Sequence, residues 1–157
     1  MSKEIIASII GAGATIAAGL LVYLLSRGYY RHSQKIEKHR LLKELFKEFN
    51  ERYDVINNEL DNISRLTNLE WAELSDEDKK EAKGIVIDFF NICAEEYYWY
   101  TEKSIDEGIW SSWQKGMNDI FNRSEIILQI WDDECKNDGF KSYYINKKYA
   151  FFKEVVY

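Results

Sequence analysis

Few residues of this chain have the types and spacing that catalysis or metal binding requires. The two histidines, His32 and His39, are seven residues apart. On a helix they share one face, but no set of acids or cysteines accompanies them. Neither an E-x-x-H pair nor an H-E-x-x-H motif occurs, so the sequence predicts a solvated histidine pair and no metal site.

The acids and cysteines give equally little support for catalysis. The run Asp132–Cys135 is the densest acidic cluster, but consecutive helical side chains point in different directions, which favours an exposed helix end over a cation site. Cys93 has no histidine or asparagine partner to activate it. Glu95 and Glu96 are the candidate acids of an enzyme acting at a membrane surface, although they could simply accept hydrogen bonds from tyrosine and tryptophan. The sequence predicts no catalytic residues, no cofactor and no metal.

Aromatic side chains are concentrated in the second half of the chain. They include residues 97–100, Trp131, Tyr143 and Tyr144. Rings at a groove are common in partner-binding surfaces, and the candidate partner-binding residues are Tyr97, Trp99, Trp110 and Trp113. The alternative, which we favour, is that a small bundle fills its core with large side chains.

The elements that must position these residues begin with an apolar run from Ile5 to Leu25. A helix of this length spans the roughly 30 Å hydrocarbon core of a bilayer. A cleaved signal peptide, a buried core helix and an interfacial helix each fit less well. The sequence predicts a retained transmembrane anchor over residues 1–27, followed by a juxtamembrane helix and cytoplasmic domain over residues 28–157.

Charge predicts the orientation of this anchor. Residues 27–43 carry a net charge of +5, whereas the whole chain carries −6. The positive-inside rule then places the N-terminus outside and the C-terminal domain in the cytoplasm of a cell whose inner or plasma membrane holds the anchor. Only two cysteines, far apart, fit a reducing compartment. The acidic domain argues against nucleic acid as a partner. The candidate contacts to anionic lipid headgroups are Arg27, Arg31, Lys35 and Lys38, although the cluster could be a topology signal alone.

Small residues recur along one side of the apolar run. Such a stripe lets helix backbones approach closely in lipid, and it predicts a homo-oligomer. The alternative is that alanine and glycine are simply frequent in membrane helices. The candidate self-association residues are Ala7, Gly11, Ala14, Thr15, Ala18 and Gly19.

The rest of the sequence has helical spacing and no proline. An apolar stripe predicts a long helix over residues 33–65, which either packs on its own domain or forms a coiled coil. Ser75 is the predicted N-cap of a helix ending near Tyr100. Ser104 and Glu107 are the predicted capping box of the next helix. A short helix over residues 124–135 and a frayed helical tail follow. The predicted fold is all-α, with a small cytoplasmic helical bundle.

Residues 85–121 carry a resemblance. The segments I-D-F-F-N at 87–91, E-E-Y-Y at 95–98, S-I-D at 104–106 and I-W-x-x-W at 109–113 resemble an uncharacterised family of small bacterial and phage membrane proteins. Those proteins combine an N-terminal transmembrane helix, a long amphipathic helix and a helical domain of unknown function. The resemblance implies a membrane-tethered helical domain and no catalytic residues.

Two functions fit this sequence. The first is a single-pass membrane-anchored interaction or regulatory protein without catalytic activity, which binds an unidentified cytoplasmic protein. The alternative is a membrane-acting effector, such as a toxin, a holin-like protein or a component of abortive infection or phage defence, that assembles through its transmembrane helix. The absence of a strongly polar face on the apolar run disfavours a pore.

Overall fold

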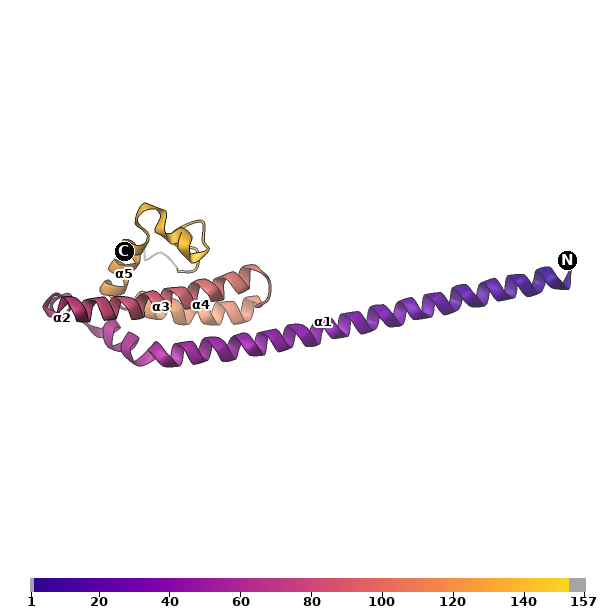
Figure 1. Ribbon diagram of the computed structural model, residues 1–157, viewed down its shortest axis with the longest axis horizontal. Helices are drawn as coiled ribbons and strands as arrows, with labels where there is room; N and C mark the ends of the chain where they lie inside the picture. Colours follow the sequence, from indigo (N-terminus) through magenta and orange to yellow (C-terminus); the bar gives the residue numbers. More distant parts are fainter. Residues whose placement is uncertain (1, 153–157) are drawn as a thin grey trace. The chain divides into compact units, whose positions relative to one another are not determined.

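The computed structural model describes residues 2–152, and within this range it is helical without strands (Figure 1). The predicted all-α class is therefore confirmed. Contacts divide the chain into two compact units, Met1–Leu41 and Leu42–Tyr157. The elements are α1 (Lys3–Arg65), α2 (Asn68–Glu73), α3 (Asp76–Thr101), α4 (Glu107–Phe121), α5 (Glu125–Glu134) and the 3-10 segment η1 (Lys136–Tyr143).

The first unit holds the N-terminal part of α1. Residues 15–40 are all exposed, including apolar side chains such as Ile16 and Leu24. The side chains of residues 4–10, 12 and 14 lie outside the described set. Over the described residues, no helix combines the length and the apolar character that crossing a membrane requires. The transmembrane span expected over Ile5–Leu25 therefore stays a prediction from the sequence.

The second unit contains the rest of α1, whose apolar stripe faces the bundle. These stripe residues are buried or half-buried, as expected for a helix that packs on its own domain. The helix ends at Arg65, where the spacing predicted its end. The stripe consists of Leu42, Leu45, Phe49, Tyr53, Ile56, Leu60 and Ile63.

Helix α3 is central to the bundle and contacts α4, α5 and η1. Its N-cap is Ser75, whose hydroxyl accepts a hydrogen bond from the Asp78 N–H at 3.1 Å, as predicted. Val86, Phe89 and Phe90 are completely buried. A capping box that the sequence analysis did not identify, Thr67 with Glu70, starts α2; both residues lie in the connection between α1 and α3.

Helix α4 begins differently from the prediction. Its N-cap is Asp106, which accepts a hydrogen bond from the Ile109 N–H at 3.1 Å. The predicted capping box of Ser104 and Glu107 is wrong, because the Ser104 N–H donates to the Trp99 carbonyl and Glu107 accepts a hydrogen bond from the Tyr100 hydroxyl at 2.6 Å. The residues that follow α3 form a turn with Lys103 in the left-handed region, and this turn takes Ser104 out of the capping position.

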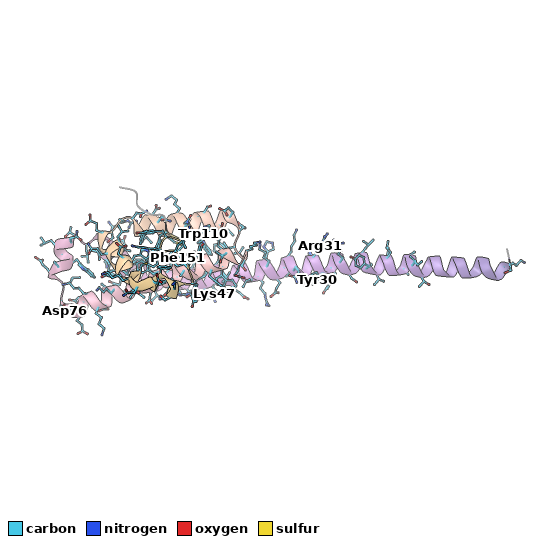
Figure 2. All side chains as sticks on the ribbon, turned by 90° about the horizontal axis from the view of Figure 1, so that it is seen from above. Tyr30, Arg31, Lys47, Asp76, Trp110 and Phe151 are labelled. Atoms are coloured by element: carbon cyan, nitrogen blue, oxygen red, sulfur yellow. The ribbon has the colours of Figure 1, made fainter. Side chains whose placement is uncertain are left out.

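The C-terminal segment is packed into the bundle. Helix α5 lies within the short helix predicted over residues 124–135, and its N-cap is Ser124. The chain turns at Asn137 and Asp138, which both have positive φ. A Cβ on Gly139 would lie 1.8 Å from the Glu134 carbonyl oxygen, so glycine is required there. The expected frayed helix is replaced by η1 and then by non-helical chain up to residue 152. Phe151 and Phe152 are buried, and Figure 2 shows Phe151 among the densely packed side chains.

Candidate functional site

The predicted aromatic groove is mostly internal packing. Trp110 is 4% exposed and stacks on Tyr100, with ring centroids 4.8 Å apart and planes at 13°. Tyr97 contacts Trp110 at 5.5 Å and Phe151 at 6.0 Å. The ring of Trp99 contacts the ring of the adjacent residue Tyr98. These rings join α3 to α4 and to the C-terminal segment, and so they contribute mainly to packing.

Trp113 lies elsewhere, between α4 and α1. Its ring makes edge-to-face contacts with Phe46 at 5.0 Å and with Phe49 at 5.7 Å. The side chain is half-buried, so part of it stays open to solvent. Of the four predicted partner-binding residues, Trp113 is the one that lines a cavity described below.

A cavity of about 240 Å³ lies between α1, α3 and α4 within the second unit. We call it the Glu96 pocket, because Glu96 contributes its most deeply buried polar group. Asn50, Ser112 and Gly116 are exposed and give the pocket an open rim. The lining residues are Phe49, Asn50, Tyr53, Glu96, Ser112, Trp113, Gly116, Met117 and Ile120.

Glu96 is 2% exposed. Its carboxyl group accepts a hydrogen bond from the Tyr53 hydroxyl at 3.2 Å, and that hydroxyl also lies 3.8 Å from the Cys93 sulfur. Burial raises the pKa of Glu96 to about 8, against the smaller opposing effects of the Tyr53 hydrogen bond and the Arg52 charge. Glu96 can therefore exchange a proton near neutral pH.

Tyr53 and Cys93 stay protonated at neutral pH. Burial is the main cause that raises the pKa of each, and the neighbouring Glu96 carboxyl adds to it. A thiol whose pKa is raised is a poor nucleophile. The cluster can therefore bind a cation or hold a proton, but it presents no activated cysteine.

Arg52 and Glu95 hold α1 against α3 beside the pocket. The Arg52 guanidinium donates to both carboxylate oxygens of Glu95, at 2.5 and 3.0 Å, and both side chains are about one-third exposed. The hydrogen bond to Glu95 is the main cause that raises the pKa of Arg52. The two candidate acids of the sequence thus have different surroundings, because Glu95 is ion-paired and Glu96 is buried.

The acids of residues 132–134 are each engaged separately. Asp132 pairs with Lys148 at 2.5 Å and Asp133 with Lys136 at 2.6 Å. Glu134 accepts a hydrogen bond from the Tyr143 hydroxyl at 3.0 Å. Among the residues that the structure describes, no three histidine, cysteine, aspartate or glutamate side chains are grouped so that they could hold a metal ion.

The predicted membrane residues lie in the first unit. Arg27, Arg31, Lys35 and Lys38 are exposed, and Figure 2 shows Arg31 on the helix beside Tyr30. Within the small-residue stripe, the four described members are exposed, and a Cβ on Gly11 or Gly19 would meet no atom within 4 Å. Those four are Gly11, Thr15, Ala18 and Gly19. The side chains of Ala7 and Ala14 lie outside the described residues.

Sequence reasoning identified Glu96 and Trp113 but not the wall that α1 contributes. Phe49 and Tyr53 belong to the apolar stripe that predicted the helix over residues 33–65, and the sequence assigned them no further role. The usable signal was Tyr53, because a side chain with a polar end on a buried helix face needs a hydrogen-bond partner.

No protein-family model matches the chain, and comparison with characterised proteins and with solved structures finds no similar protein. The resemblance of residues 85–121 therefore stays an interpretation of the sequence.

Proposed function

We propose that this protein is a single-pass membrane-anchored helical interaction protein without catalytic activity. Residues 1–27 would be the anchor, and the bundle of residues 42–157 would be the binding module on the cytoplasmic side. The observation that carries the proposal is the apolar run Ile5–Leu25 with the basic residues that follow it. A polar bundle joined to such a run suits a domain held at a membrane surface.

Two features of the first unit support the anchor. Its described large apolar side chains, such as Leu20 at 61% and Leu25 at 65% exposed, would be unfavourable in water but suit lipid. The Thr15 hydroxyl donates to the Gly11 carbonyl at 2.9 Å, so this polar group has a partner within its own helix, as lipid requires.

Topology can be tested by cysteine labelling of the protein expressed in bacterial cells. Both native cysteines are buried, so a membrane-impermeant maleimide should label the wild type weakly. We expect Ser2→Cys to react in intact cells and Val55→Cys to react only after the membrane is opened. Release of the protein by alkaline carbonate, or equal labelling of both variants in intact cells, would contradict the proposal.

Self-association would use the small-residue stripe. Gly11→Leu should lower crosslinking between copies in membranes, because a large side chain prevents close approach of the backbones. Gly13→Leu is the matched control, since two residues place Gly13 about 200° around the helix from Gly11. A Cβ at either position would meet no atom within 4 Å. Equal crosslinking by the two variants would contradict a role for the stripe.

A further inference from the structure

We propose that the Glu96 pocket binds a small organic ammonium ion, with the Glu96 carboxylate as its counter-ion and the aromatic side chains around it as its walls. This inference does not depend on the membrane anchor, because the pocket lies entirely within Leu42–Tyr157. The occupant to which we commit is a free small amine in its protonated form.

The first argument is the position of the carboxyl group. Glu96 is almost completely buried, yet it lines a pocket with an exposed rim. The Tyr53 hydroxyl is its hydrogen-bond donor within the described chain, at 3.2 Å. A carboxylate can accept several hydrogen bonds, so an ammonium group in the pocket would supply further donors and the compensating charge.

The second argument is the surrounding aromatic surface. Phe49, Tyr53 and Trp113 line the same pocket. Aromatic rings attract cations through their negative faces, and tryptophan does so most strongly. The nearest cationic side chain of the bundle, Arg52, is bound by both oxygens of Glu95. It is therefore engaged elsewhere and does not neutralise Glu96 directly.

Size and charge narrow the class of ligand. The cavity of about 240 Å³ is smaller than the usual range for drug-sized ligands, which favours a small molecule. Residues 44–157 carry a net charge of −11, because the chain's total of −6 includes +5 on residues 27–43 and zero on residues 1–26. A domain with this charge attracts cations and repels anions.

The protonation of Glu96 gives the proposal a measurable signature. With a pKa of about 8, the empty pocket holds mostly the neutral acid at pH 7. A bound cation would favour the carboxylate, so binding should release close to one proton. The other titratable groups that face Glu96 are Tyr53 and Arg52 on α1 and Cys93 and Glu95 on α3. The α4 residues that line the pocket add none, since they are Ser112, Trp113, Gly116, Met117 and Ile120.

The experiment is calorimetric titration of the full chain in a neutral maltoside detergent with n-butylammonium chloride at pH 7. Two buffers with different heats of ionisation report the protons released. We expect saturable binding with proton release, and no saturable binding of n-butanol or potassium chloride. Failure of the wild type to bind butylammonium, or equal binding of butanol, would overturn the proposal.

A matched pair of variants locates the site. Glu96→Gln keeps an acceptor for Tyr53 but removes the charge, and it should weaken binding at least about tenfold and abolish proton release. Glu81→Gln makes the same change at an exposed position of α3, fifteen residues earlier, and should alter affinity by no more than about twofold. Circular dichroism checks that both variants are folded. Equal affinities of the two variants would overturn the assignment to Glu96.

Gly116 offers a second test that leaves the carboxyl group intact. It lines the pocket, and a Cβ there would meet no atom within 4 Å. Gly116→Leu should therefore fill part of the pocket and block binding. Gly84→Leu on α3 is the control, because its Cβ also meets no atom within 4 Å. Unchanged binding by Gly116→Leu would overturn the pocket as the site.

A lipid headgroup could present the same ammonium chemistry. The titration is therefore repeated in nanodiscs of phosphatidylglycerol with and without phosphatidylethanolamine. An unchanged dissociation constant supports a free amine as the occupant. A clear increase with phosphatidylethanolamine would overturn the free amine in favour of the lipid.

Discussion

The carboxyl group of Glu96 is buried, so its ionised form is poorly solvated. The group lies against Tyr53 and Cys93, and ionising it in that position lowers the free energy of unfolding. Such groups are frequent in functional sites, where affinity or proton transfer compensates for the lost stability. In the proposed complex, this carboxyl group is the counter-ion of the ammonium ion bound in the pocket.

The pH dependence of stability follows from this carboxyl group. The folded protein keeps its proton up to about pH 8, whereas glutamate ordinarily loses it near pH 4.5. Folding therefore takes up a proton between these values, and the free energy of unfolding falls as pH rises through the window. Glu96→Gln lacks this effect. The free energy of unfolding of Glu96→Gln minus that of the wild type should therefore increase by a few kcal/mol, on the order of 3–5, from pH 4.5 to 8.

Urea unfolding of the full chain in detergent, followed by circular dichroism at several pH values, measures this difference. Glu81→Gln is the control, since Glu81 is an exposed glutamate on the same helix. A constant difference between Glu96→Gln and the wild type across the window would show that Glu96 ionises normally in the folded state.

The start of α4 depends on one residue, Asp106. Its carboxylate caps the Ile109 N–H, whereas the Ser104 side chain lies outside the helix. Asp106→Ala should cost about 1 kcal/mol of stability, and Ser104→Ala should cost less than about half of that. Thermal melts of the two variants measure the difference. A larger loss of stability in Ser104→Ala than in Asp106→Ala would mean that the capping box predicted from the sequence is correct.

The segment after α5 stabilises the bundle, although it contains little regular structure. The ring of Phe152 stacks on Phe121 with centroids 3.9 Å apart and planes at 6°, and it also contacts Phe90 and Trp131. This segment therefore closes the core formed by α3, α4 and α5.

Truncating one ring tests this closure. Phe152→Ala should lower the free energy of unfolding by about 3–5 kcal/mol, because it removes a large buried side chain and leaves a cavity. Val55→Ala, at a position 81% exposed, should change it by less than about 0.5 kcal/mol. Denaturant titrations compare the two. Similar values would mean that the C-terminal segment is dispensable for the core.

The whole chain joins two units of different character. Residues 3–40 are helical and those of their side chains that the structure describes are exposed, whereas residues 42–152 hold the core with the Glu96 pocket. Each unit has its own internal contacts, so the bundle should not need the first unit in order to fold. The net charge also differs between the parts, at +5 for residues 1–43 and −11 for residues 44–157.

A fragment of residues 42–157 should therefore fold alone. We expect it to unfold in one cooperative transition, with a helical circular dichroism spectrum and without detergent. Size-exclusion chromatography then checks that the fragment is monodisperse. Loss of cooperativity would mean that the bundle depends on the N-terminal part of α1.

The sequence was sufficient to predict the longer helices, although not α2, because helical periodicity and N-caps depend on residues only a few positions apart. The stripe from Leu42 to Ile63 and the cap Ser75 could be recognised for that reason. The cap of α4 was missed because Glu107 is engaged by Tyr100, seven residues earlier. Local patterns do not contain such competition between partners.

The candidate site could be identified only from the tertiary structure. Glu96 and Tyr53 are 43 residues apart in sequence and meet only when α3 packs on α1. Whether a carboxyl group is buried or ion-paired depends on which helix faces it, and this separates Glu96 from its neighbour Glu95. The same holds for the rings, since Trp110 became part of the core and Trp113 a wall of the pocket. Periodicity tells which side of a helix is apolar, but the neighbour on that side depends on long-range packing.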